Sequence, residues 1–391
     1  MANVYDVAVV GLGLVGSAGL RHLSAGGLSC VGVGPGEPPD WSTHEGVFAS
    51  HYDSGRITRR LDKRREWALL AGRAITAYPE IEAASGITFH HPVGVLMADV
   101  DPDRVAAIVA VAQGLGVGFD RYEAGESFDD NRIAVPPTAT ALREPSPGGF
   151  IDPRKMLAAQ LVVARQNGAE VLGEQVAGVE RRSGGGWIVR TTDGTTVEAT
   201  QVMIAAGPHA DEIDGPPRTP LIEVVAETVV LARLSAADRS RLAGLPSIIV
   251  DDVDEHHYIV PPTEYPDGHV YVKLGATRHQ QSVLAPNERR EWMTGTQHEA
   301  DVDWLRGLML SVLPGLQAEA WLTKPCLIPD TPTKLPYLEI VEPGLVMAVG
   351  MNGYAAKSAD SIGALAAGLV VKGEWTDPYL DEQSFKLISR D

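Results

Sequence analysis

The sequence predicts an α/β protein in which a Rossmann-type domain, built from several chain segments, is interleaved with a second domain that contains a large mixed or antiparallel sheet. The first observation is an apolar run over residues 4–10 that ends at Gly11-x-Gly13-x-x-Gly16 and leads into a helical pattern. A second apolar run, Leu28–Val33, follows it. Strand, glycine turn, helix and strand in this order predict a βαβ unit.

The second observation is that helical and strand patterns alternate in long blocks along the chain. Helical material around Arg65–Tyr78 is followed over residues 86–143 by short strand patterns with one helix near Asp103–Leu115. Longer strand patterns return over residues 218–283, with a helical segment near Ser235–Leu245. Two strand-rich stretches separated by other elements predict a second domain inserted into the first.

The third observation is the material between and after these stretches. Asp152 and Pro153 are a cap and a first-turn residue for a helix. The alternating runs Gln175–Arg181 and Trp187–Thr192 precede a turn and a strand that ends at Gly207. A strand, LVMAVG, and a helical ADSIGALAAGLVV then repeat the opening pattern near the end of the sequence.

We therefore expect two interleaved domains, as the length of 391 residues also suggests. Residues 1–85, 146–217 and 325–391 are predicted to form the nucleotide-binding domain. Residues 86–145 and 218–324 are predicted to form the substrate domain.

The composition limits the partners. Acidic residues outnumber basic ones by 51 to 33, which gives a net charge of −18. Nucleic acids and anionic membranes both attract positive surfaces, so neither is expected as a partner. The apolar stretches are short and broken by Gly, Pro or charge, and the N-terminal one lacks the basic start of a signal peptide. We expect a cytoplasmic protein and a monomer.

The two cysteines, Cys30 and Cys326, are too few for a disulfide framework or a zinc cluster, and no metal is expected. Cys30 lies in an apolar, strand-like run and is interpreted as a buried core thiol. Cys326 lies between Pro325 and a turn-rich stretch, an unusual place for a residue that only fills space.

The glycine motif predicts a dinucleotide site. The glycines allow a sharp turn and close approach of the backbone to a pyrophosphate, which the helix N-terminus then binds. The second strand of such units ends in an acid that binds the adenosine ribose, but here that position is Gly34. Glu37 is a candidate replacement. The motif alone leaves FAD and a nicotinamide cofactor both open.

Four further segments, in order, resemble the monomeric sarcosine oxidase and N-methyltryptophan oxidase family. Residues 50–59, SHYDSGRITR, are similar to the family's S-H-H-G-D-T-R-I-I-R, and residues 272–275, VKLG, to its L-K-L-G. Cys326 with Thr331 is similar to the C-M-Y-T region, and residues 350–357, GMNGYAAK, to G-F-S-G-H-G-F-K. The resemblance spans nearly the whole chain and implies an FAD enzyme of the D-amino-acid-oxidase-like superfamily.

The resemblance implies a covalent flavin. Cys326 matches the cysteine that bonds to the flavin 8α carbon, and a thiolate is a suitable nucleophile for that bond. The residues expected to contact the cofactor are Gly11, Gly13, Gly16, Ser50, Arg56, Gly207, Cys326, Gly350, Gly353 and Lys357.

The resemblance also implies the substrate site. Arg59 and Lys357 match a pair that binds the substrate carboxylate, by a guanidinium fork and a point charge. Arg56 matches an arginine beside the flavin, and Lys273 a lysine that promotes reaction of the reduced flavin with oxygen. Tyr258 matches a tyrosine that faces the substrate.

The sequence departs from the family around the amine. Tyr52 replaces the second histidine of the His-His pair, and Tyr354 replaces the histidine that precedes the last lysine. Thr277 stands where the family has a histidine, with His279 nearby. His51 and Tyr354 are candidates for positioning the substrate. These exchanges put sarcosine itself in doubt and make a cyclic imino acid as plausible as an N-methyl amino acid.

The resulting hypothesis is an FAD-dependent oxidase of a carboxylate-bearing secondary or cyclic amine. Hydride passes from the carbon next to nitrogen to the flavin, and oxygen reoxidises the flavin to give hydrogen peroxide and an imine. The alternatives are a flavin amine dehydrogenase, a glycated-amino-acid oxidase of the same superfamily, and an inactive flavin-binding partner protein. A flavin monooxygenase is disfavoured because the chain has one dinucleotide motif.

Overall fold

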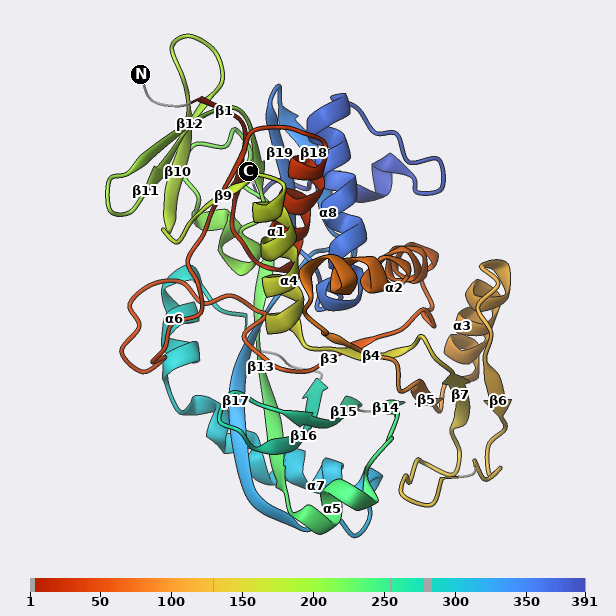
Figure 1. Cartoon of the computed structure of the whole chain (residues 1–391). Coiled ribbons are helices and arrows are strands. Elements are labelled where there is room, and N and C mark those ends of the chain that lie inside the picture. Colours follow the sequence, from red (N-terminus) through yellow and green to blue (C-terminus); the bar gives the residue numbers. More distant parts are fainter. Residues whose placement is uncertain (1–3, 129, 254, 278–282, 391) are drawn as a thin grey trace.

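The computed structural model describes residues 4–128, 130–253, 255–277 and 283–390. It has two large sheets, each with its own helices, and a small sheet between them (Figure 1). The predicted α/β class with a Rossmann-type unit and a large mixed sheet is confirmed.

The first large sheet has the order β10-β11-β12-β1-β2-β9, and β19 adds to β12 with β18 beside it. Strand β1 lies between β12 and β2 and is parallel to both, as in a Rossmann unit. The four C-terminal residues of β1 are buried, as expected for a strand covered on both faces. The strands are β1 (Val4–Val10), β2 (Cys30–Val33), β9 (Glu170–Leu172), β10 (Val176–Arg181), β11 (Trp187–Thr191), β12 (Thr196–Ile204), β18 (Tyr337–Glu342) and β19 (Leu345–Val349).

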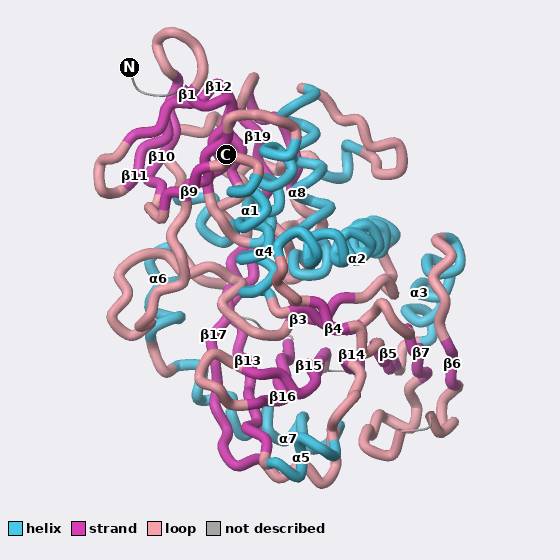
Figure 2. Tube along the Cα trace, in the orientation of Figure 1, coloured by secondary structure: helices cyan, strands magenta, loops and turns pink. Residues whose placement is uncertain are grey.

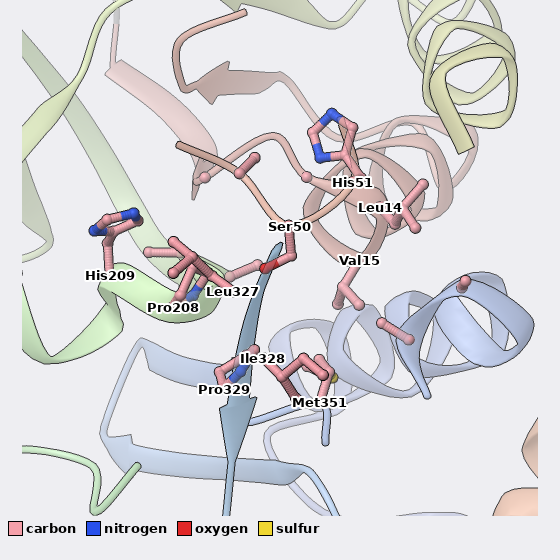
Figure 3. Close-up of a pocket in the computed structure, with 18 of the residues that line it drawn as sticks. Leu14, Val15, Ser50, His51, Pro208, His209, Leu327, Ile328, Pro329 and Met351 are labelled. Carbon is pink, nitrogen blue, oxygen red and sulfur yellow. The ribbon is translucent and has the colours of Figure 1, made fainter. Parts of the chain in front are cut away.

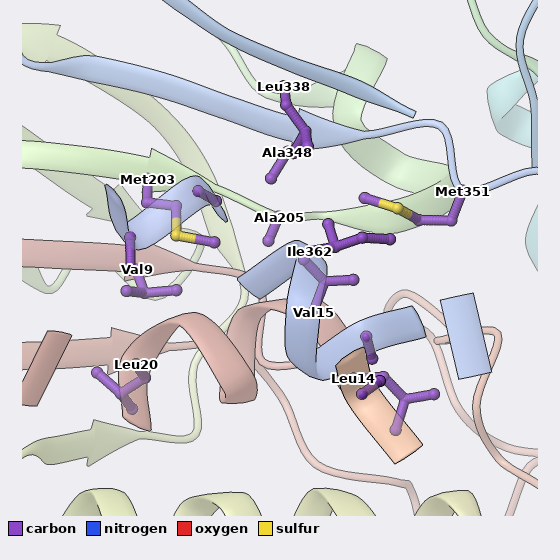
Figure 4. Close-up of a cluster of buried hydrophobic side chains, with 14 of the residues drawn as sticks. Val9, Leu14, Val15, Leu20, Met203, Ala205, Leu338, Ala348, Met351 and Ile362 are labelled. Atoms are coloured by element: carbon purple, nitrogen blue, oxygen red, sulfur yellow. The ribbon is translucent and has the colours of Figure 1, made fainter. Parts of the chain in front are cut away.

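Long helices cover this sheet, and α1 contacts both α8 and α4. Their apolar side chains meet those of the strands, for example Leu20 and Ile362 beside Val9 and Met203 (Figure 4). Asp152 caps α4 by accepting a hydrogen bond from the Lys155 backbone N–H at 3.1 Å, as predicted. The helices are α1 (Leu14–Ala25), α2 (Arg65–Ser85), α4 (Pro153–Gln166) and α8 (Ala355–Lys372).

The second large sheet has the order β17-β13-β16-β15-β14-β5-β7-β6. It is antiparallel except where β14 pairs with β5. The strands are β5 (Val95–Asp99), β6 (Asp120–Tyr122), β7 (Thr140–Glu144), β13 (Glu223–Leu234), β14 (Ser247–Asp251), β15 (His256–Glu264), β16 (Val270–Thr277) and β17 (Ala318–Asp330).

Most of the helices that accompany this sheet are shorter than those on the first sheet (Figure 2). The α-helices are α3 (Pro102–Gly114), α5 (Ala236–Arg241), α6 (Pro286–Thr294) and α7 (Val302–Val312); the short 3₁₀ turns are η1 (Gly207–Glu212), η2 (Gln297–Asp301) and η3 (Glu382–Phe385). The predicted helices near residues 103–115 and 235–245 correspond to α3 and α5, although α5 is shorter than expected.

The small sheet joins the two halves. It contains β3 (Arg56–Thr58), β8 (Gly149–Ile151) and β4 (His90–His91), in that order. The division into two domains stays a prediction. Residue 325, one of its boundaries, lies inside β17 rather than in a linker.

No helix in the described part of the chain combines the length and the apolar character needed to cross a bilayer.

Candidate functional site

A cavity of about 660 Å³ lies where the elements of the two large sheets meet. Its walls come from distant segments: the glycine loop after β1, residues 49–52, η1, the C-terminal part of β17 and the N-terminus of α8. Figure 3 shows Ser50 and His51 on one side of this space, and Ile328, Pro329 and Met351 across it. The volume is within the range of cofactor and substrate sites.

Most of the predicted site residues line this one cavity. They are Gly11, Gly13, Ser50, His51, Arg56, Arg59, Gly207, Tyr258, Cys326, Gly353, Tyr354 and Lys357. Three predicted residues, Gly16, Lys273 and Gly350, are not part of its described lining. The roles given to these residues stay predictions.

The glycine loop fits a pyrophosphate. A Cβ on Gly16 would lie 1.8 Å from the Gly11 carbonyl oxygen, so the first turn of α1 packs directly on the loop only because that residue is glycine. A Cβ on Gly13, by contrast, would meet one side chain at 3.8 Å, which leaves its backbone open to the cavity. No acidic residue occupies the first turn of α1. The free N–H groups at this terminus can therefore bind phosphate oxygens.

The ribose end of the site has no carboxylate where a Rossmann unit places one. A Cβ on Gly34 would lie 2.7 Å from the Leu12 backbone nitrogen, so the end of β2 is packed against the glycine loop. Glu37, the candidate replacement, accepts two hydrogen bonds from Arg154, at 2.5 and 2.6 Å. Glu37 also lies outside the described cavity lining.

Cys326 lies at the cavity wall and differs from Cys30 in its surroundings. Cys30 is 1% exposed within the core, as predicted, and burial raises the pKa of its thiol to about 12. Burial also raises the pKa of Cys326, but the Arg56 guanidinium, 3.5 Å from Sγ, opposes this rise. A cation beside the sulfur favours the thiolate over a thiol buried among apolar groups.

A first cluster of charges surrounds Asp53; we call Arg56, Asp53, Lys273 and Tyr265 the Asp53 cluster. Asp53 accepts hydrogen bonds from Lys273 Nζ at 2.6 Å, from Tyr265 Oη at 2.7 Å and from Arg56. Lys273 also donates to the Gly55 carbonyl. Burial, and after it the charge of nearby Arg56, lower the pKa of Lys273 to about 8 against the opposing charge of Asp53. Lys273 is thus held in an ion pair behind the cavity wall.

A second cluster surrounds Asp62; we call Arg59, Asp62 and Lys357 the Asp62 cluster. Asp62 Oδ2 accepts hydrogen bonds from Lys357 Nζ at 2.6 Å and from Arg59 Nη1 at 3.1 Å. Burial raises the pKa of Asp62, but the two cations outweigh it and bring the pKa to about 2. Both cations line the cavity, and with Asp62 ionised the cluster carries one net positive charge.

Aromatic groups complete the wall near the Asp62 cluster. Tyr354 stacks on Trp67 with ring centroids 4.9 Å apart, and Lys357 Nζ lies 4.7 Å from the Tyr354 ring centroid. This cation–π contact restrains the lysine. Burial, with the charges of Arg154 and Arg56, lowers the pKa of His51 to about 3, so its imidazole is neutral. Burial also raises the pKa of Tyr258 well above its ordinary value, so its hydroxyl stays protonated.

Sequence reasoning missed three buried acids at this site: Asp53, Asp62 and Glu227. Asp53 and Asp62 bind the predicted cations, and Glu227 lines the cavity with 7% of its surface exposed. The one signal for Glu227 was a carboxylate inside the apolar run EVVAETVVL, which demands a partner or a function. Thr277 lines the cavity as well, whereas His279 lies outside the described residues. No group of three or more His, Cys, Asp or Glu residues in the described chain is arranged to hold a metal ion.

Several curated proteins match nearly the whole chain, and two of them are described here. The monomeric sarcosine oxidase of Streptomyces avermitilis is 24% identical over 387 residues, which is 97% of this chain and 96% of that protein. The N-methyl-L-tryptophan oxidase of Yersinia pestis strain Pestoides F is 24% identical over 375 residues, or 93% of this chain and 94% of that protein.

Solved structures share the fold. NikD, described as an unusual amino acid oxidase essential for nikkomycin biosynthesis, aligns with a TM-score of 0.77 at 19% identity over 100% of this chain and 98% of that one. L-proline dehydrogenase from P. horikoshii aligns with a TM-score of 0.74 at 18% identity over 97% and 96% of the two chains. Glycine oxidase from Bacillus cereus aligns with a TM-score of 0.72 at 18% identity, over 99% of each chain.

The family model described as DAO, FAD dependent oxidoreductase, matches residues 6–369. This match covers the glycine loop, both charge clusters and the N-terminus of α8. The chain therefore belongs to the family of FAD dependent oxidoreductases.

Proposed function

We propose that this protein oxidises a small secondary or cyclic amine that carries a carboxylate, with FAD as the hydride acceptor and oxygen as the final acceptor. The products are an imine and hydrogen peroxide. One observation carries the proposal: the dinucleotide-binding glycine loop and the Arg59–Lys357 cations line the same cavity. The relatives named for sarcosine and N-methyl-L-tryptophan support it.

The chain's own residues would hold the cofactor and orient the substrate. Gly11, Gly13 and the N-terminus of α1 would bind the pyrophosphate of FAD, and Cys326 would bond to its ring system. FAD supplies the two-electron acceptor for the C–H bond next to the amine nitrogen. Arg59 and Lys357 would bind the carboxylate and so fix which C–H bond is presented.

The electrostatics of the Asp62 cluster suit one small anion. Both cations already share Asp62, so a substrate carboxylate adds to a site with one net positive charge rather than two. Lys357 has three N–H donors and, among the described residues, one hydrogen-bond acceptor. Its free donors and the remaining donors of Arg59 are what the substrate would occupy.

Matched amines test the function. The visible absorption of the FAD-loaded protein would be followed without oxygen while N-methyl amino acids, cyclic amino acids and the same amines lacking the carboxylate are added. We expect bleaching by one carboxylate-bearing class and at least roughly 100-fold weaker half-saturation by its decarboxylated partner, since two charged hydrogen bonds are lost. Bleaching by no amine, or equal response to both partners, would overturn the proposal.

Acid precipitation tests the covalent attachment. Yellow colour should stay in the pellet of the wild-type protein and of Cys30→Ala, and should move to the supernatant for Cys326→Ala. Colour released from the wild-type protein would remove the thioether and leave the flavin non-covalently bound.

One observation favours a second candidate, an amine dehydrogenase. Lys273, the expected oxygen-side cation, is ion-paired with Asp53 and lies outside the described cavity lining. Peroxide measured on aerobic turnover distinguishes the two: one equivalent per amine oxidised supports the oxidase, and reoxidation only by an added electron carrier supports the dehydrogenase.

A further inference from the structure

A row of polar side chains crosses the second large sheet at one level. Glu227 on β13 lies opposite Cys326 on β17, and Thr277 on β16 lies opposite His256 on β15. Thr277 lowers the pKa of the Glu227 carboxyl, as a hydroxyl close to it does, and this proximity joins the two pairs. All four residues line the cavity. Neighbouring side chains on one face of a sheet interact directly, so the row is continuous from the proposed flavin attachment point outward.

Glu227 is buried next to Cys326, near the inner end of this row, and takes no part in the proposed binding of cofactor or carboxylate. Burial raises the pKa of its carboxyl, and Arg56 and His256 only partly oppose that rise. A carboxyl with a raised pKa is a better match for a proton that must move near neutral pH. The titratable and charged groups that face it from the surrounding elements are Arg56, His256, Lys273, Tyr258 and Cys326.

The outer end of the row reaches solvent. The His256 side chain is 45% exposed, and its Nδ1 lies 2.8 Å from Asp251 Oδ1. Burial raises the pKa of Asp251, but its contacts with His256 outweigh this and the pKa is lowered overall. The row thus connects a buried carboxyl to a surface imidazole through a hydroxyl that can both donate and accept.

The proposed reaction needs such a path. A free amino acid carries an ammonium group, whose nitrogen has no lone pair to support loss of a hydride from the adjacent carbon. The proton must therefore leave before oxidation, and the cavity already contains Arg56, Arg59 and Lys357. A further positive charge enclosed with these cations is unfavourable.

We propose that Glu227 accepts the proton of the substrate ammonium and that Thr277 and His256 carry it to solvent. The N–H bond breaks and its electron pair stays on nitrogen, while an O–H bond forms on Glu227. Thr277 accepts that proton and gives its own to His256, which releases one to water. No electrons change hands in this step. The inference rests on the proposed amine oxidation and adds a proton acceptor to it.

The pH dependence of anaerobic flavin bleaching tests this role. Glu227→Gln should be bleached roughly 100-fold or more slowly than wild type at neutral pH, the usual contribution of a positioned base. Its rate should recover as the pH approaches the pKa of the free amine, because the substrate then arrives uncharged. Glu223→Gln, the same substitution at an exposed position of the same strand, should keep the wild-type profile.

Two variants keep the test informative if Glu227→Gln folds poorly. Thr277→Val removes the relaying hydroxyl and should slow bleaching at neutral pH, while Thr277→Ser should restore it. The bleaching rate of Thr277→Val should also recover at high pH, which a merely structural role of Thr277 would not produce.

Calorimetry supplies a readout that does not depend on turnover. The probe is α-aminoisobutyrate, which has an ammonium and a carboxylate but no C–H next to nitrogen. Its binding heat, compared in two buffers with different ionisation enthalpies, should report about one proton released by wild type and none by Glu227→Gln. Equal proton release, or equal pH profiles while the wild type is bleached by amines, would overturn this inference alone. A wild type that no amine bleaches would overturn the proposed function.

Discussion

The Asp53 and Asp62 clusters have the same ingredients and different positions. Each holds one arginine and one lysine against one buried aspartate, and the two arginines, Arg56 and Arg59, are three residues apart. In the Asp53 cluster the lysine is buried behind the wall and the carboxylate also binds Tyr265. In the Asp62 cluster both cations face the cavity.

The difference is in the donors that remain free. Lys273 gives hydrogen bonds to Asp53 and to the Gly55 carbonyl, and it is 1% exposed. Lys357 gives one to Asp62, and an aromatic ring restrains it. Identical charge counts therefore produce two different clusters. The Asp53 cluster is closed and stabilises the wall, whereas the Asp62 cluster is open and can bind a ligand. Position relative to the cavity, rather than composition, separates the two roles.

The largest expected effect comes from breaking the closed cluster. Asp53→Asn should lower the free energy of unfolding by about 3–5 kcal/mol, because it leaves Lys273, which is 1% exposed, buried without a counterion. Asp62→Asn should cost less, because its cations face the cavity and can be solvated there. Chemical denaturation of both variants, with the exposed Asp120→Asn as a control, measures the difference. A loss for Asp53→Asn no greater than that for Asp62→Asn would contradict the comparison.

The next effect concerns ligand binding by the open cluster. Arg59→Ala should weaken the binding of a simple carboxylate by roughly 30-fold, the equivalent of about 2 kcal/mol for a charged hydrogen bond. Titration of the flavin absorption with the carboxylate gives the dissociation constant. Arg65→Ala, at an arginine of α2 outside the described cavity lining, should leave it unchanged. Equal affinity of the two variants for the carboxylate would contradict the proposed role of Arg59.

The pH dependence of the same titration sharpens the comparison. The pKa of Lys357 is lowered to about 8, first by burial and then by Arg59, so its charge is present below pH 8 and lost above it. Carboxylate affinity should therefore fall by roughly tenfold between pH 7 and 10 as one charged contact is lost. Lys357→Met should bind weakly at every pH, with this fall removed. A fall that persists in Lys357→Met would assign the titration to another group.

The smallest expected effect is on the closed cluster's lysine. Lys273→Met should change carboxylate affinity by less than about twofold and keep its pH dependence, although the pKa of Lys273 is also lowered to about 8. The reason is that Nζ is tied to Asp53 rather than directed into the cavity. A large loss of affinity in this variant would mean that the two clusters act as one.

The sequence predicted the parts of the fold that depend on local pattern. The glycine loop, the parallel strands beside it and the Asp152 cap follow from residues close together in the chain. The length of α5 could not be predicted in this way. Its start is set by the Ser235 cap, whereas its end depends on packing. The candidate site residues came from the resemblance, and most of them line one cavity.

What the sequence could not predict is which charges pair. Lys273 and Asp53 are 220 residues apart, and Lys357 and Asp62 are 295 apart, so no local pattern connects them. Glu37 follows the expected ribose position closely, but Arg154 from α4 binds it instead. In the sequence, Glu227 is a single polar residue within an apolar strand. The sheet register is what places it opposite Cys326.

The pairing of β13 with β17 has a consequence for how this protein can change. Side chains alternate between the two faces of a strand, so gaining or losing one residue ahead of Glu227 would turn Ala226 or Thr228 toward the cavity. Substitutions along these strands can accumulate singly, whereas changes of length would be tolerated only in pairs. Lineages descended from this chain should therefore show single substitutions at the less buried positions of β13, keep Glu227, and change the length of the strand only by two residues at a time.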